Sequence, residues 1–344
     1  MCEPVTRKGH QIFTTELIRF AERSADPRIA AIIDQISCPL TVAVRGRDGV
    51  GRSTVAAALA DSGVAVVEDE TADVHVVVVA EAVKPEDRAM LRSGSSCTSP
   101  PRRPTLVVLN KADLAGFGSG GPLAVADRRA TEIRAMVGVP VVPMVALLAT
   151  AALDDELISA LRVLAAEPAD LTSTDGFLAG EHSVSRSVRA RLLNTLDLFG
   201  IAHGVLALRQ AAEPAALPTV LRGLSQIDRV LAQLAVAGAE VRYRRLQSAL
   251  VQLRTMATRR PALAEFVRGD DAVIAVMAAA VDVMRAAGLE VDADDGPPAH
   301  LCRAVHWQRY GRGPVNQLHR SCAADISRGS LRLLRRAQAG TVTR

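Results

Sequence analysis

The sequence has few aromatic residues and almost no lysine. Only 3% of its 344 residues are Phe, Trp or Tyr, which argues against a main activity that depends on stacking aromatic side chains on nucleic-acid bases. Of the 41 basic residues, only Lys8, Lys84 and Lys111 are lysines. Each of these lysines is therefore a candidate for a specific role.

The cysteines lack the spacing of a metal site or of a disulfide framework. Five are present, at Cys2, Cys38, Cys97, Cys302 and Cys322, and no two form a CxxC motif. Neither a zinc site nor disulfides are expected from such scattered thiols. We therefore expect a cytoplasmic protein.

The chain also lacks a long uninterrupted apolar run. Its first residues, MCEPVTRKGHQ, contain no apolar signal core. The uncharged stretch of residues 137–153 is interrupted by Pro140 and Pro143 and is too short for a transmembrane helix. We interpret it as a buried strand and the loop that follows.

Residues 40–166 alternate short apolar runs with helical patterns. This alternation predicts an α/β domain with a mostly parallel sheet and flanking helices. The expected strands cover residues 40–44, 64–67, 74–80, 106–109 and 139–144. The expected helices cover residues 54–60, 85–92, 127–137 and 154–166.

The rest of the chain has helical periodicity. Residues 1–39 contain two short helical patterns, and residues 167–183 have the composition of a linker. Residues 184–344 predict an α-helical bundle domain with an acidic linker near residues 291–298. The helices of residues 1–39 are expected to join this bundle. The expected helices cover residues 184–199, 202–211, 217–237, 239–259, 271–287 and 299–337.

Residues 46–54, GRDGVGRST, follow the first expected strand and open a helix. In this setting, glycines let backbone N–H groups surround a phosphate, and the helix N-terminus favours its negative charge. Ser53 is placed to bind Mg²⁺. The alternative is a glycine-rich turn with no ligand.

Arg52 stands where the phosphate-loop pattern has lysine. Arginine keeps the positive charge, but its planar fork is not equivalent to a compact ammonium group. Nucleotide binding is compatible with this change, whereas efficient catalysis is not expected.

A second motif, Asn110-Lys111-Ala112-Asp113, stands at the end of the expected strand over residues 106–109. An NKxD motif after a phosphate loop resembles the translation-factor-related class of P-loop GTPases, in particular its Era-like and dynamin-like branches. The resemblance implies that Asp113 accepts hydrogen bonds from guanine ring nitrogens, which adenine cannot supply. It also implies that Asn110 and Lys111 brace the loop and cover the base. The alternative is an ordinary loop between a strand and a helix.

In this family the last strand leads to a Ser-Ala loop whose backbone contacts the guanine oxygen. The corresponding segment here is Met144-Val145-Ala146-Leu147, with Val145 in place of serine, and a plain loop is an equal alternative. The ligands implied are GTP or GDP with Mg²⁺. The candidate nucleotide contacts are Gly46, Asp48, Gly49, Val50, Gly51, Arg52, Ser53, Thr54, Asn110, Lys111, Asp113, Val145 and Ala146.

The switch motifs of the family are degenerate in this sequence. Residues 61–72 leave room only for one short strand and a turn, and no switch threonine lies there. Asp69 is a second candidate Mg²⁺ ligand beside Ser53, although a solvated turn is the alternative for it. Ala72 stands where the DxxG motif requires glycine. We therefore expect a GTPase with slow or no hydrolysis, and no catalytic residue is assigned.

The arrangement of helices on both sides of the nucleotide domain resembles dynamin-like GTPases. It implies a guanine-nucleotide-binding protein whose nucleotide domain regulates or stabilises the helical bundle, with a related GTPase or a second copy as partner. One alternative is a pseudo-GTPase scaffold that binds no nucleotide. Another is an ATP-dependent P-loop enzyme, against which the NKAD motif argues.

The C-terminal segment is rich in arginine. Its arginines alternate with Leu331, Leu333 and Leu334, a pattern typical of peripheral contact with an anionic membrane. The alternative is a solvated helix face, and no specific nucleic-acid binding is expected. The arginines are Arg328, Arg332, Arg335, Arg336 and Arg344.

Overall fold

The computed structural model describes residues 9–24, 26–68, 71–92, 103–116, 118–210 and 212–342. They form two compact units. One unit contains residues 40–234, and the other contains the described residues before Leu40 together with those from Ala235 onward. The division falls within the long helix α11 (Ile227–Ala257).

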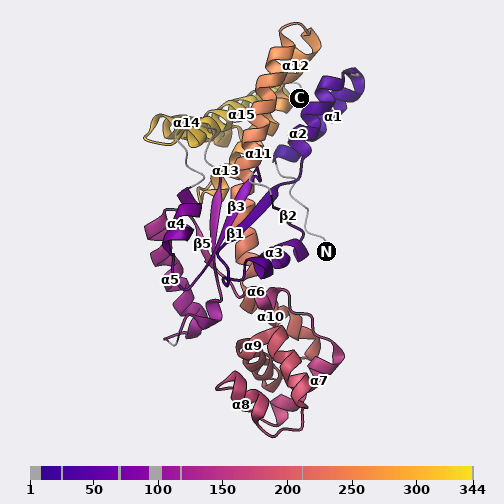
Figure 1. The fold of residues 1–344 in the computed structure, drawn as a ribbon. Coiled ribbons are helices and arrows are strands. Elements are labelled where there is room, and N and C mark those ends of the chain that lie inside the picture. Colours follow the sequence, from indigo (N-terminus) through magenta and orange to yellow (C-terminus); the bar gives the residue numbers. More distant parts are fainter. Residues whose placement is uncertain are drawn as a thin grey trace. The chain divides into compact units, whose positions relative to one another are not determined.

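A five-stranded sheet forms the centre of the first unit (Figure 1). All neighbouring strands are parallel, in the order β2-β1-β3-β4-β5. The expectation of an α/β domain with a parallel sheet and flanking helices is confirmed. The strands are β1 (Thr41–Gly46), β2 (Ala65–Val67), β3 (Val74–Ala80), β4 (Thr105–Asn110) and β5 (Val141–Pro143).

The register of the sheet brings the ends of separate strands together. Gly46 pairs with Val78, Ala80 pairs with Asn110, and Leu109 pairs with Pro143. Because the strands are parallel, the loops that follow β1, β4 and β5 leave the sheet at one edge. The valines of β3 are buried on both faces, as is usual for a parallel strand covered by helices.

Helices cover the sheet on both sides (Figure 1). Val77, Val79 and Leu109 pack in one cluster with Ala130 and Ile133 of the fifth helix. That helix begins six residues before the expected start, after Gly120 in the left-handed conformation and with Pro122 in its first turn. The helices are α3 (Arg52–Asp61), α4 (Pro85–Arg92), α5 (Gly121–Val137), α6 (Ala146–Ala149) and α7 (Asp155–Ala166).

The segment expected to be a linker contains a packed helix, α8 (Thr174–Ala179). The Ser173 hydroxyl accepts a hydrogen bond from the Gly176 N–H at 3.0 Å, which caps the helix. Phe177 is fully buried, and the guanidinium of Arg189 donates to its carbonyl. Residues 167–183 differ from the expectation because one aromatic side chain and one cap are enough to fix a short helix in the core.

Two further helices, α9 (Arg186–Arg209) and α10 (Leu217–Ser225), also belong to the sheet-containing unit. Among the described residues, α9 alone is long and apolar enough to be a candidate membrane span. Its Leu192, Leu196 and Ile201 are buried in a cluster with Leu161 of α7. Core packing therefore accounts for part of its apolar character.

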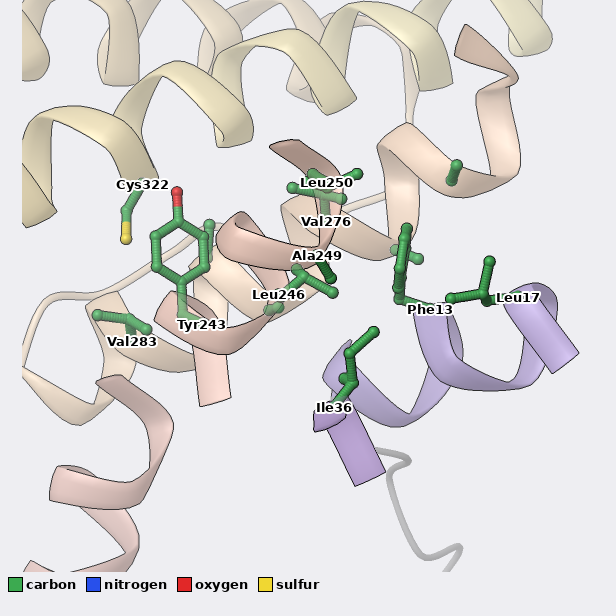
Figure 2. Packing of buried hydrophobic residues seen from close by; sticks show 14 of the residues in the cluster. Phe13, Leu17, Ile36, Tyr243, Leu246, Ala249, Leu250, Val276, Val283 and Cys322 are labelled. Carbon is green, nitrogen blue, oxygen red and sulfur yellow. The ribbon is translucent and has the colours of Figure 1, made fainter. Parts of the chain in front are cut away.

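The second unit is entirely helical in its described residues. Phe13, Leu17 and Ile36 from the N-terminal helices share one core with Leu246 and Leu250 of α11 (Figure 2). The unit contains α1 (Gly9–Ser24), α2 (Pro27–Ser37), most of α11, α12 (Pro261–Arg268), α13 (Asp270–Ala286), α14 (Pro297–Arg312) and α15 (Gln317–Val342).

The helix expected over residues 299–337 is two helices, α14 and α15. The break falls after Arg312, where Gly313 and Pro314 end the first helix, because proline cannot donate the helical hydrogen bond. Trp307 is buried, and the Tyr310 hydroxyl and His319 Nδ1 share a hydrogen bond of 2.7 Å. The aromatic residues near this break therefore join the two helices.

Candidate functional site

The loop of residues 46–54 follows β1 and leads directly into α3. A Cβ added to Gly46 would lie 2.8 Å from the Val78 carbonyl oxygen, so glycine permits the close approach of this loop to β3. Gly49 and Gly51 both have positive φ, at 80° and 82°, a conformation that strains other L-residues. Val50 between them is buried and anchors the loop.

Asn110 at the end of β4 joins two separate loops. Its Nδ2 donates to the Val50 carbonyl at 2.9 Å, and its Oδ1 accepts from the Ala146 N–H at 3.0 Å. The side chain is 5% exposed, so both bonds are shielded from water. Asn110 therefore holds the glycine-rich loop and the loop after β5 in one arrangement.

The loop after β5 is fixed mainly through its backbone. The Val145 N–H donates to the Ser225 carbonyl at 3.0 Å, while the Ala146 N–H donates to Asn110. The two N–H groups expected near a guanine oxygen therefore already have protein acceptors. Ala112 N–H donates to the Met144 carbonyl at 3.1 Å, which ties this loop to the NKAD segment.

Lys111 and Asp113 lie in the loop after β4. Lys111 adopts a left-handed conformation with φ of 58° and its side chain is exposed. Burial raises the pKa of the half-buried Asp113 carboxyl, its own backbone hydrogen bond opposes this, and the charge of Asp197 adds to the increase. Asp113 is thus a partly desolvated acceptor, the property that a group selecting a ligand N–H requires.

Asp197 was not predicted as a site residue. It interrupts α9 with φ of 56° and ψ of 176°, a backbone region that is almost restricted to glycine and is often found at functional sites. Its Oδ1 accepts from the Leu198 N–H at 2.6 Å. The sequence predicted a break between helices over residues 184–199 and 202–211, and it gave no signal that Asp197 itself would interrupt the helix.

An ion pair connects the glycine-rich loop with α4. Arg47 Nε lies 2.9 Å from Asp87 Oδ1, and the Lys84 N–H donates to the other carboxylate oxygen at 2.9 Å. Asp87 is fully buried. The hydrogen bond to Asp87 raises the pKa of Arg47. Sequence analysis missed this pair because nothing in the pattern relates Arg47 to a residue 40 positions later.

The predicted phosphate and metal contacts lie at the start of α3. Arg52 and Ser53 are its first two residues and are exposed, as is Asp48, while Thr54 is half-buried. Asp69 lies outside the described residues. Within the described ranges, no group of three or more His, Cys, Asp or Glu side chains is placed to hold a metal ion. Of the two predicted Mg²⁺ ligands, Ser53 is therefore the one that lies among the described residues.

The chain matches no protein-family model, no curated protein and no solved structure.

The strand order itself marks one edge of the sheet. The chain passes from β1 to β2 on one side, whereas β3, β4 and β5 follow on the other side of β1. Ligands of open parallel sheets bind outside the carboxyl ends of the strands, where the order reverses. Residues 46–54 leave the sheet at this position, and Asn110 ties them to the neighbouring loops.

Proposed function

We propose that the chain binds guanine nucleotides at the carboxyl edge of its parallel sheet. The observation that carries this proposal is the pair of hydrogen bonds from Asn110 to Val50 and Ala146. Through them, a residue of the NKAD motif holds the glycine-rich loop and the loop after β5 together. Such a constellation suits a P-loop GTPase fold, in which the glycine-rich loop contacts phosphate and the NKxD loop contacts the base.

The phosphates would lie at residues 46–54 and the N-terminus of α3. Backbone N–H groups of the loop and the helix dipole favour negative charge at this position. The exposed guanidinium of Arg52 supplies the positive charge that lysine gives in the common motif. Ser53 would hold Mg²⁺, whose role is to neutralise phosphate charge.

Guanine selection rests on Asp113. A carboxylate that is partly removed from water gains more from two ligand N–H donors than an exposed one does, and loses more when they are missing. Adenine lacks these donors. The exposed side chain of Lys111 in the same loop would cover the base.

The proposed activity is binding with slow or absent hydrolysis. Ala72 is buried where a glycine would be needed in a switch motif, and Arg52 replaces the usual lysine. Both features favour a site that retains nucleotide over one that turns it over rapidly.

The proposed role of nucleotide binding is to regulate or stabilise the helical unit. The chain passes between the units twice, before Leu40 at the start of β1 and within α11. Occupancy of the site would therefore bias the helical unit through these connections, and the partner would be a related GTPase or a second copy, in the cytoplasm or at a membrane surface. Arg332, Arg335 and Arg336 pair with Asp270 or Asp271, which favours a packing role over lipid contact for this part of the C-terminus.

One titration tests the proposal against its alternatives. Purified protein is titrated with fluorescent GTP, GDP, ATP and XTP, together with the Asp113→Asn variant and the exposed control Asp175→Asn. We expect guanine preference in the wild type and the control, and a change toward xanthine in Asp113→Asn. Absence of all nucleotide binding would instead support a pseudo-GTPase scaffold, and a preference for ATP would support an ATP-dependent enzyme.

A further inference from the structure

The helical unit contains a cavity whose lining residues lie outside the proposed nucleotide site. Its volume is about 430 Å³, within the range of small-molecule sites. Four arginines and no acidic residue belong to its lining. The lining residues are Arg254, Ala257, Thr258, Ala264, Val267, Arg268, Val273, Arg328 and Arg332.

Two of these arginines have carboxylate partners. Arg328 Nη1 lies 3.0 Å from Asp325 Oδ1, and Arg332 Nη1 lies 3.1 Å from Asp270 Oδ1. Each carboxylate is also engaged elsewhere, because Asp325 accepts from Tyr243 at 2.7 Å and Asp270 contacts Arg335 at 2.7 Å. Asp325 and Asp270 are therefore each shared with a further group, and they do not neutralise the positive charge of the four arginines.

The other two arginines carry the unbalanced charge. Arg254 at the end of α11 and Arg268 at the end of α12 are exposed, and neither forms an ion pair with any described residue. Four arginines thus line the cavity, and two of them, Arg254 and Arg268, have no carboxylate partner among the described residues. Ala257, Ala264 and Val267 give it a small apolar floor.

We propose that this cavity binds a compact organic phosphate with more than one phosphate group. Guanidinium groups match the oxygen geometry of phosphate and form charge-assisted hydrogen bonds with it. The arginines come from three helices, α11, α12 and α15, which suits separate phosphates on one small scaffold. The scaffold itself packs on the apolar floor.

The test uses the full chain and two probes that distinguish the source of the phosphate. Soluble inositol 1,4,5-trisphosphate is titrated by calorimetry, and vesicles containing phosphatidylinositol 4,5-bisphosphate are used in sedimentation. The variant is Arg254→Gln/Arg268→Gln. The control, Arg309→Gln/Arg312→Gln, removes the same charge from the exposed end of α14.

We expect the wild type and the control to bind the soluble probe equally, and the Arg254/Arg268 variant to bind at least about tenfold more weakly. Matching thermal midpoints of the two variants exclude a folding effect. If the protein binds the soluble probe and also sediments with the vesicles, the ligand is a lipid headgroup. If it binds the soluble probe but does not sediment with the vesicles, the ligand is a soluble phosphate. Both outcomes support the site. Equal affinities of all three proteins, or no binding to either probe, would overturn it. Guanine-nucleotide affinity is expected to stay unchanged in both variants, so this outcome is separate from failure of the proposed function.

Discussion

The side-chain amide of Asn110 lies directly over the α-carbon of Gly51. A Cβ added to Gly51 would be 2.4 Å from Asn110 Nδ2, closer than Cβ atoms come to non-bonded neighbours in real proteins. Gly51 also has φ of 82°, where a side chain adds roughly 1–2 kcal/mol of strain. The Asn110 side chain therefore leaves no room for any residue larger than glycine at position 51.

We expect Gly51→Ala to destabilise the protein by about 1–3 kcal/mol, because it combines this strain with displacement of a buried amide. Urea unfolding measures the change. Gly223→Ala in α10 is the control, since nothing lies within 4 Å of the added Cβ. The control is expected to be neutral or slightly stabilising. Equal stabilities for both variants would contradict the tight contact between Gly51 and Asn110.

Removal of the Asn110 side chain is predicted to have a larger effect on binding than on folding. Asn110→Ala leaves the Val50 carbonyl and the Ala146 N–H without their partner, at a cost of about 1–3 kcal/mol. Both loops of the proposed nucleotide site then lose their common support. Calorimetry with GDP and urea unfolding are compared with those of the exposed control Asn194→Ala. Unchanged GDP affinity in Asn110→Ala would show that the two hydrogen bonds of Asn110 do not support the proposed nucleotide site.

The sheet was largely predictable from the sequence, whereas the helical boundaries were not. Short apolar runs rich in valine are typical of strands in a parallel sheet covered by helices, and all five strands appear close to their expected positions. Residues 167–183 contain few apolar residues, and their helix depends on Phe177 and the cap at Ser173. Phe177 packs against residues of other helices, among them Leu161 and Leu192, and a single buried aromatic residue leaves no periodic pattern in the sequence.

The site was predictable where it depends on local motifs. Glycines at positions 46, 49 and 51 indicated the loop after β1. Arg47 with Asp87, and Asp197 beside Asp113, depend on helices that approach the loops from elsewhere in the chain. Their pairing is a property of tertiary packing, for which a single sequence contains no direct signal.

The ion pair between Arg47 and the buried carboxylate of Asp87 is expected to contribute to stability. Asp87 is fully buried, and a buried carboxylate that loses its cationic partner is left with an uncompensated charge. The Lys84 N–H bond to Asp87 remains, so we expect urea unfolding to show a moderate loss of stability in Arg47→Ala that is larger than the loss in Arg222→Ala. Arg222→Ala is the control, because its pair with Asp228 is exposed and worth at most about 1 kcal/mol. A double-mutant cycle with Asp87→Asn isolates the coupling. A coupling near zero would show that packing alone holds this loop.

Cys322 is predicted to react with thiol reagents only after unfolding. It is buried beside the ring of Tyr243 (Figure 2), and burial raises its pKa to about 12. Cys38 and Cys302 are exposed and serve as internal controls. In a Cys2→Ser/Cys97→Ser background, we expect two thiols to be labelled in the native protein and a third in urea. Rapid native labelling of Cys322 would show that this part of the helical core opens readily.

Asp113 gives the proposed nucleotide site a predictable pH dependence. Burial, with the charge of Asp197, raises its folded-state pKa above the ordinary value of 3.8. The folded state therefore binds a proton more tightly than the unfolded state, and the nucleotide-free protein loses stability as the pH rises from 3.8 through the raised pKa. We expect Asp113→Asn to be more stable than the wild type at neutral pH, with the difference vanishing below pH 3.8.

Guanine binding has the opposite dependence, because only the ionised carboxylate accepts both base N–H donors. As the pH falls, GDP affinity is expected to decrease earlier than an ordinary aspartate would allow. Asp197→Asn removes the repulsive charge and keeps a side chain of nearly the same size, so the midpoint of this decrease is expected to move to lower pH. GDP titrations across the acidic range measure it, with Asp175→Asn as the control. An identical midpoint in Asp197→Asn and the wild type would mean that Asp197 does not act on the base-binding carboxylate.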